Sequence, residues 1–140
     1  MSRVLPDTSA WIAWLRQADS RLPFRPAGAN ATIWLSAVAL QELDAGARGK
    51  HRDAVSALEA SFARADRILV PQRDDWKQAG LLLSEVAVRF GYEQIGRNRL
   101  TNDALLAVSA SRRGLTLLTA NSHDFARLAL FLPLDWRLAG

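Results

Sequence analysis

The chain has 140 residues, no cysteine, two histidines and a formal net charge of +4. This length fits a single domain, residues 1–140, that buries a core without disulfides or a structural metal. The absence of cysteine excludes cysteine-ligated zinc, iron–sulfur clusters and thiol nucleophiles. Two histidines also disfavour an all-histidine metal site within one chain. Any catalytic metal is therefore expected on oxygen ligands, which favours Mg²⁺ or Mn²⁺.

The positive charge comes almost entirely from arginine, since Lys50 and Lys77 are the only lysines among 18 basic residues. Arginine grips phosphate oxygens in a bidentate manner, but an arginine bias also follows from genomic base composition. The charge therefore permits a nucleic-acid partner without requiring one. No stretch approaches the ~18 consecutive apolar residues of a membrane helix. Asp7 falls where a signal peptide needs an apolar segment, so we expect a cytoplasmic protein with no membrane partner.

In chain order, the first elements predicted are a short strand and a helix. Val4 and Leu5 form an apolar run that ends at Pro6, which cannot donate a ladder hydrogen bond. Thr8 and Ser9 can cap the helix that follows. The apolar face of that helix contains Trp11, Ile12, Trp14 and Leu15.

The remaining elements alternate between short apolar runs and amphipathic segments. They are a loop at 19–31, a strand at 33–35, a helix from Ser36 through Leu43, a helix at 52–67, a strand at 68–71, a helix at 76–90, a loop at 91–102, a helix at 102–112 ended by Gly114, a strand at 115–119, a short helix through Phe125 and Leu128, and an edge strand at 130–132. Strands alternating with helices predict an α/β sandwich with a mostly parallel sheet. Ligands bind such sheets beyond the carboxyl ends of the strands.

Acidic and amide side chains follow two of the predicted strands. Asp7 comes directly after the first strand, and Asn121 and Asp124 follow the strand at 115–119. Asp103 begins a helix, and Glu42 lies late in the helix that starts at Ser36. In a parallel sheet the two strand ends meet at one edge, where converging carboxylates persist only with compensating cations. With so few soft ligands, the plausible cation is a hard divalent metal.

Each acid also has a purely structural interpretation. Asp7 and Asp124 can cap helices, and Asp103 in a first helical turn complements the helix dipole. Glu42 and its neighbour Asp44 can belong to a solvated helix face. Taken singly, these positions decide nothing, so the interpretation depends on their joint placement.

Four segments in order carry a resemblance to a known family. They are DTSAWI at 7–12, SAVALQEL at 36–43, TNDALLA at 101–107 and LLTANSHDF at 117–125. These segments resemble the four motifs of PIN-domain ribonucleases. Their order and spacing, which cover essentially the whole chain, are similar to those of VapC-type toxins of bacterial toxin–antitoxin pairs.

The resemblance implies a PIN-like three-layer α/β/α sandwich and a Mg²⁺- or Mn²⁺-dependent endoribonuclease. It carries over Asp7, Glu42 and Asp103 as the core catalytic acids and metal ligands. The fourth catalytic position falls to Asp124, as an outer or water-mediated ligand, or to Asn121. In the first case Asn121 and Thr119 act as hydrogen-bonding support. One departure is Pro6, which stands where the family more usually has an aliphatic residue.

The resemblance also implies partners. RNA is the expected substrate, and Arg97 and Arg99 are candidates for gripping its backbone, although a solvated loop explains them equally well. A small cognate antitoxin is expected to lay a segment along an apolar groove, with a homodimer or a hetero-oligomer with antitoxin as the assembly. The helix carrying Trp11, Trp14 and Leu15, together with Phe24, can help form that groove, although core burial is the simpler interpretation for at least two of the three helix residues.

Three other function classes fit the sequence less well. A haloacid-dehalogenase-type phosphatase needs an aspartate two residues after its nucleophile, where this chain has Ser9. A receiver-like domain needs paired acids near the first strand and a lysine late in the chain, and neither is present. A catalytically silent PIN-like scaffold or RNA-binding adaptor remains the main alternative, and the retention of all the principal acids argues against it.

Overall fold

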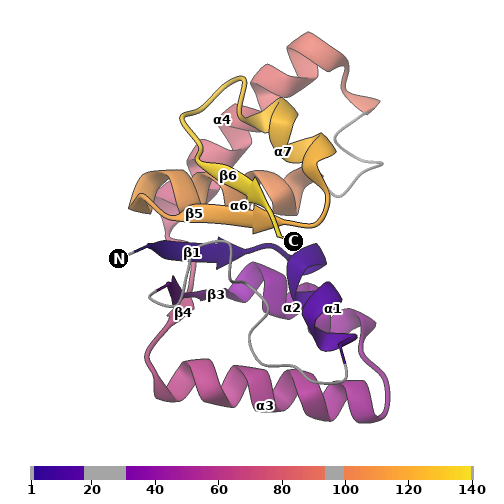
Figure 1. Ribbon diagram of the computed structural model, residues 1–140. Helices are drawn as coiled ribbons and strands as arrows, with labels where there is room; N and C mark the ends of the chain where they lie inside the picture. Colours follow the sequence, from indigo (N-terminus) through magenta and orange to yellow (C-terminus); the bar gives the residue numbers. More distant parts are fainter. Residues whose placement is uncertain (1, 18–30, 94–99, 140) are drawn as a thin grey trace.

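The computed structural model describes residues 2–17, 31–93 and 100–139 (Figure 1). Its main sheet has the strand order β2-β1-β5-β6, and every pairing in it is parallel. The four strands are β1 (Arg3–Pro6), β2 (Thr32–Ile33), β5 (Thr116–Thr119) and β6 (Trp136–Leu138). A separate parallel pair consists of β3 (Leu35–Ser36) and β4 (Ile68–Leu69). The predicted α/β class with a mostly parallel sheet is therefore confirmed.

Helices connect these strands, as parallel pairing requires. They are α1 (Thr8–Leu15), α2 (Ala37–Gly46), α3 (Lys50–Arg64), α4 (Arg73–Phe90), α6 (Leu100–Arg113) and α7 (Ser122–Leu128). Among the described residues, no helix combines the length and apolarity needed to cross a membrane.

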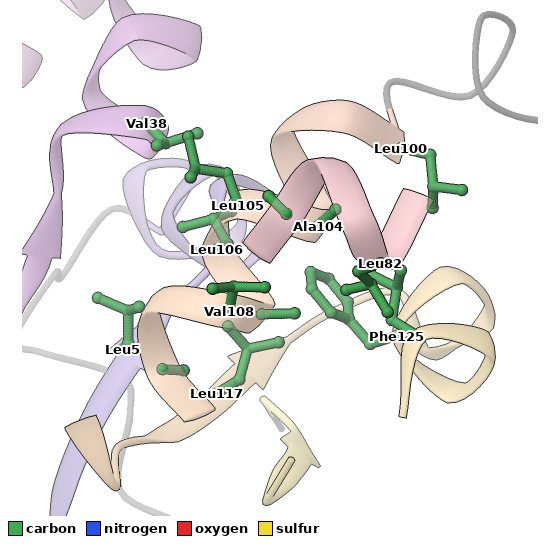
Figure 2. Close-up of a cluster of buried hydrophobic side chains, with 14 of the residues drawn as sticks. Leu5, Val38, Leu82, Leu100, Ala104, Leu105, Leu106, Val108, Leu117 and Phe125 are labelled. Carbon is green, nitrogen blue, oxygen red and sulfur yellow. The ribbon is translucent and has the colours of Figure 1, made fainter. Parts of the chain in front are cut away.

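The two faces of the sheet carry separate cores. Successive side chains of a strand point to opposite faces. Leu5 and Leu117 accordingly pack with α4, α6 and α7, in the cluster that Figure 2 shows. Val4 and Leu118 pack with α1, α2 and α3 on the other face. Figure 1 shows these helix groups on opposite sides of the strands. The three-layer α/β/α arrangement is thus confirmed.

Several boundaries of strands and helices in the structure differ from those predicted from the sequence. The run at 33–35 is two strands rather than one, because the backbone on either side of Trp34 pairs with different sheets. Helix α4 begins at Arg73, three residues before its predicted start, because Gln72 and Asp75 form a capping box. The predicted end of α6 is confirmed, since Gly114 follows its last residue at a φ of 65°.

The predicted edge strand at 130–132 is wrong. Leu130 and Phe131 donate backbone hydrogen bonds to Arg127 and Leu128, so this segment is a turn that continues from α7. The last strand is instead β6, whose Trp136 lies in register with Leu117 of β5.

A buried ion pair fastens α4 to the end of α6. Asp75 is fully buried and accepts hydrogen bonds from Arg112 at 2.7 Å and from Arg113 at 2.7 and 3.0 Å. It also accepts one from the backbone N–H of Gln72. Burial alone would raise the pKa of Asp75, but the hydrogen bonds from Arg113, Gln72 and Arg112 outweigh it and lower the pKa to about 2.

Asp75→Ala should destabilise the fold by about 3 kcal/mol. The substitution leaves Arg112 and Arg113 without their carboxylate partner and removes the capping box at the start of α4. Chemical denaturation monitored by circular dichroism measures the change. Asp74→Ala, at the exposed neighbouring position, should have little effect, and equal losses for both variants would contradict the role assigned to Asp75.

The Asp75 carboxylate also makes the stability of the fold depend on pH. Its pKa is lower in the folded than in the unfolded chain, so its stabilisation is present above about pH 4 and is lost as the pH falls toward 2. Asp75→Asn should lack this acid-dependent step in melting temperature, while wild type and Asp74→Asn retain it.

Candidate active site

Asp7 lies at the carboxyl end of β1 and is almost fully buried, at 4% exposure. Its backbone N–H donates to the Leu118 carbonyl of β5 at 2.8 Å, which ties it to the neighbouring strand end. Its Oδ1 caps α1 by accepting from the Ala10 N–H at 2.9 Å. The predicted caps Thr8 and Ser9 are therefore wrong. Pro6 is accommodated as the last residue of β1.

Two hydroxyl groups hold the Asp7 carboxylate. Thr119 Oγ1 lies 2.6 Å from Asp7 Oδ2, and Ser9 Oγ donates to Asp7 Oδ1 at 2.7 Å. Ser9 Oγ also accepts from the Ala120 N–H at 3.0 Å, so it bridges the ends of β1 and β5. Burial raises the pKa of Asp7, these hydrogen bonds lower it in part, and the charge of Glu42 raises it further, for a net increase.

Glu42 reaches the same place from α2. Its Oε1 accepts from Thr8 Oγ1 at 2.7 Å, so a residue in the first turn of α1 positions the Glu42 carboxylate. Helix α2 begins with Ser36 as its N-cap, as predicted, because Ser36 Oγ accepts from the Val38 N–H. Glu42 follows this cap by about 1.7 helical turns and reaches the site from there.

Asp103 comes from α6 and Asp124 from α7, and the two carboxyl groups are hydrogen-bonded to each other. Two carboxyl groups can share a hydrogen bond only when one is protonated. The pKa of Asp103 rises to about 8, mainly through burial and then through the negative charges of Asp7, Asp124 and Glu42. Asp103 is therefore the acid of this site that keeps its proton at neutral pH, which lowers the total negative charge of the pocket.

Asn121 has a different role from the acids. It is the N-cap of α7, where its Oδ1 accepts from the His123 N–H at 3.2 Å. Its backbone N–H donates to Thr119 Oγ1 at 2.9 Å, and its carbonyl lies 2.8 Å from the same hydroxyl. Asn121, rather than Asp124, therefore caps this helix and supports Thr119, which leaves the Asp124 carboxyl facing Asp103.

These side chains line one pocket of about 230 Å³ beyond the carboxyl ends of β1 and β5. Among the described residues, its lining contains four acids and no basic side chain. The lining residues are Asp7, Thr8, Ser9, Ile12, Glu42, Asp103, Asn121, Asp124 and Phe125. The structure thus brings together all four predicted acids and Asn121, with Thr119 buried behind Asp7. The predicted RNA contacts Arg97 and Arg99 lie outside the described residues.

The carboxylate, amide and hydroxyl oxygens that line this pocket are ligands of the type that a hard divalent cation prefers. In the described part of the chain, no three acidic or histidine side chains are already gathered closely enough to hold one ion. Mg²⁺ does not require such a cage, since it keeps several waters and commonly binds through one or two carboxylates plus substrate phosphates. The raised pKa of Asp103 also marks a site where a cation would relieve repulsion.

Comparison with protein-family models assigns the chain to a known family. The model of the PIN domain matches residues 4–130. The chain belongs to the PIN-domain family. A search of curated protein sequences finds no match to this PIN domain.

Solved structures share the fold of this PIN domain at low sequence identity. VapBC2 from Rickettsia felis bound to a promoter DNA fragment is 20% identical, with a TM-score of 0.62 over 97% of this chain and 98% of that chain. DNA-bound VapBC from Salmonella typhimurium is 18% identical, with a TM-score of 0.64 over 100% of both chains. VapBC-5 from Mycobacterium tuberculosis is 24% identical, with a TM-score of 0.55 over 99% of this chain and 98% of that chain.

Sequence reasoning missed the hydroxyl groups that position the acids in this PIN domain. Thr8 and Ser9 were predicted only as helix caps, whereas they hold Glu42 and Asp7. The available signal was their position directly after an acid at a strand end, where a hydroxyl can reach neighbouring carboxylates.

The pKa of Asp103 predicts a pH-dependent stability in metal-free protein. The folded chain keeps this proton to about pH 8 and the unfolded chain releases it near pH 3.8, so stability falls as the pH rises between these values. Asp103→Asn should lack this decline, and its melting temperature relative to wild type should rise between pH 4 and 8 in EDTA. Asp53→Asn, at an exposed acid of α3, should follow wild type. Parallel wild-type and Asp103→Asn curves would contradict the assignment.

Proposed function

We propose that this PIN domain is a metal-dependent endoribonuclease toxin of the VapC type, neutralised by a small cognate antitoxin. The observation that carries the proposal is the convergence of Asp7, Glu42, Asp103 and Asp124 on one pocket. Full-length structural matches to chains of VapBC complexes support the toxin assignment at the level of fold. The sequence motifs support RNA as the substrate.

Asp7 and Asp103 are the proposed direct ligands of Mg²⁺ or Mn²⁺, with Glu42 completing the inner shell or holding a coordinated water. When bound, the ion supplies activation of water and stabilisation of charge at the scissile phosphate. The reaction is in-line attack of water on an RNA phosphodiester, with cleavage of the phosphorus bond to the leaving oxygen.

The residues of the chain fix the geometry for this reaction. Thr119 and Ser9 prevent the Asp7 carboxylate from rotating, and Thr8 orients Glu42. In the metal-free protein Asp124 accepts the hydrogen bond of protonated Asp103. Because the contacts of Thr119, Ser9 and Thr8 exist before substrate arrives, Asp7 and Glu42 need little reorganisation during the reaction.

The antitoxin is proposed to occupy a groove of about 240 Å³ between α1, α2 and α3. Its apolar lining includes Leu15, Leu43 and Val55, and it shares Ile12 and Glu42 with the acidic pocket. A peptide segment in this groove can therefore bury an apolar side chain and extend a basic one toward the acids.

The residues predicted from the sequence to form the antitoxin groove lie partly in the core and partly in the groove. Trp11 is fully buried in the core, Trp14 and Leu15 are half-buried against it, and Leu15 lines the groove. Phe24 lies outside the described residues.

Asp7→Asn and Asp103→Asn should each lower cleavage of RNA at least about 100-fold, because each removes a proposed metal ligand. The assay uses total cellular RNA with Mn²⁺, and EDTA should abolish wild-type cleavage. Asp44→Asn, an acid of α2 outside the pocket, should cleave as wild type. Cleavage by either pocket variant at the wild-type rate, or in excess EDTA, would overturn the metal-dependent mechanism. No cleavage by wild type would favour the silent scaffold.

Gly46→Leu tests the groove, because a Cβ at Gly46 meets no atom within 4 Å and the added side chain would fill the groove instead of straining the fold. The variant should still cleave RNA but resist neutralisation by the proposed cognate antitoxin. Ala60→Leu, at an exposed position of α3 outside this lining, should remain neutralised. Unchanged neutralisation of Gly46→Leu would contradict the proposed antitoxin site.

A further inference from the structure

Two arginine side chains stack on one phenylalanine at the end of α4. The guanidinium carbon of Arg89 lies 5.2 Å from the centroid of the Phe90 ring, and that of Arg127, from α7, lies 4.9 Å from the same centroid. The Phe90 ring packs against the core shown in Figure 2 and meets the ring of Phe131 edge-on. Two positive charges from different helices are therefore gathered on a ring that the core holds in place.

This pair of arginines lies at the same end of the fold as the acidic pocket. Helices α4 and α6 run antiparallel, because Asp75 near the start of α4 pairs with Arg112 and Arg113 at the end of α6. The end of α4 therefore lies beside the start of α6, where Asp103 is found. At 1.5 Å per residue, Arg89 lies on the order of 10 Å beyond the level of Asp103 along this pair of helices.

Helix α7 connects the acidic pocket to the arginine pair. Its Asp124 lines the pocket and is hydrogen-bonded to Asp103. Arg127 follows Asp124 by three residues, which places both side chains on one side of α7, about one turn apart. A nucleic-acid strand with one phosphate in the pocket can therefore present a neighbouring phosphate to Arg127.

Stacking leaves a guanidinium group able to bind an anion. The group contacts an aromatic ring with its flat face, whereas its five N–H donors lie in its plane and point outward. Arg89 is exposed, and within the described part of the chain it forms no ion pair or hydrogen bond. Two like charges on one ring also repel each other, and a bound phosphate would offset that repulsion. The planar fork of arginine matches phosphate oxygens in a bidentate manner.

An exposed aromatic ring follows two residues after Phe90. Tyr92 is 76% exposed, and among the described residues its ring contacts no other aromatic ring and no arginine. Proteins that bind single-stranded nucleic acid combine such rings, on which bases stack, with basic side chains that hold the backbone. The end of α4 and the adjoining α7 carry both components.

We propose that Arg89, Arg127 and Tyr92 form a binding site for single-stranded RNA beside the acidic pocket. The two arginines hold a phosphate of the strand outside the pocket, and Tyr92 stacks on a neighbouring base. RNA is favoured over an acidic protein segment because an exposed aromatic ring accompanies the arginines. The inference rests on the proposed function for the identity of its ligand, and it assigns these residues to binding, not to bond cleavage.

The first test measures binding in EDTA, which separates it from any metal-dependent cleavage. The probe is a fluorescently labelled single-stranded RNA of about 12 nucleotides, followed by anisotropy with the full-length chain. Arg89→Ala and Arg127→Ala should each raise the dissociation constant about tenfold and lower the slope of log K against log salt by about 0.7, because each removes one phosphate contact. Arg73→Ala, at an exposed arginine at the opposite end of α4, should bind as wild type.

Arg89→Ala decides the outcome, because this side chain is exposed and its loss leaves the core intact. Unchanged binding by Arg89→Ala, or weaker binding with the wild-type salt slope, would overturn the proposal. The melting temperature of Arg127→Ala identifies any loss of packing on Phe90. Absence of RNA binding by wild type would also refute the site and would assign the arginines to another partner.

The second test concerns the base. Tyr92→Ala should weaken RNA binding several-fold and leave the salt slope unchanged, because stacking on a base releases no counterions. Tyr92→Phe keeps the ring and should bind as wild type. Equal losses for Tyr92→Ala and Tyr92→Phe would contradict stacking.

The failure of this proposal is distinguishable from the failure of the proposed nuclease. If the arginine variants weaken RNA binding but wild type cleaves no RNA in Mn²⁺, the binding site is supported and the nuclease is contradicted. If wild type cleaves RNA and Arg89→Ala binds and cleaves equally well, the nuclease is supported and the binding site is contradicted.

Discussion

Carboxylate repulsion at the end of the β1–β5 pair is the constraint around which this molecule is organised. Parallel pairing brings the carboxyl ends of both strands to one edge, and helices α2, α6 and α7 add acids to the same place. The pKa of Asp103 is raised to about 8 by burial first and then by the negative charges of Asp7, Asp124 and Glu42. A cation bound there would offset the repulsion among these acids.

The rest of the fold supplies the rigidity that such a site needs. The two apolar cores clamp β1 and β5 from both faces, so the backbone at Asp7 and Thr119 has little freedom. Hydroxyl groups then fix the carboxylates themselves, with Ser9 and Thr119 on Asp7 and Thr8 on Glu42. The buried Asp75 ion pair anchors α6, the helix that carries Asp103, to α4.

Local signals and strand topology account for what could be predicted from the sequence. Pro6 and Gly114 ended elements where their backbone chemistry requires, and the acids could be placed together because parallel strands share a carboxyl edge. The roles of Thr8 and Ser9 could not be predicted, because their partners are distant in sequence. The strand predicted at 130–132 was wrong because a turn that packs on the core can have the same apolar composition as a short strand.

The central claim is that the four acids form a site for a divalent cation. Calorimetric titration of Mn²⁺ into metal-free protein at pH 7, in two buffers of different ionisation enthalpy, tests it most directly. Because Asp103 keeps its proton at this pH, binding should release about one proton per ion. Asp103→Asn should bind Mn²⁺ far more weakly and release none. Absence of binding by wild type, or equal binding by Asp103→Asn, would contradict the claim.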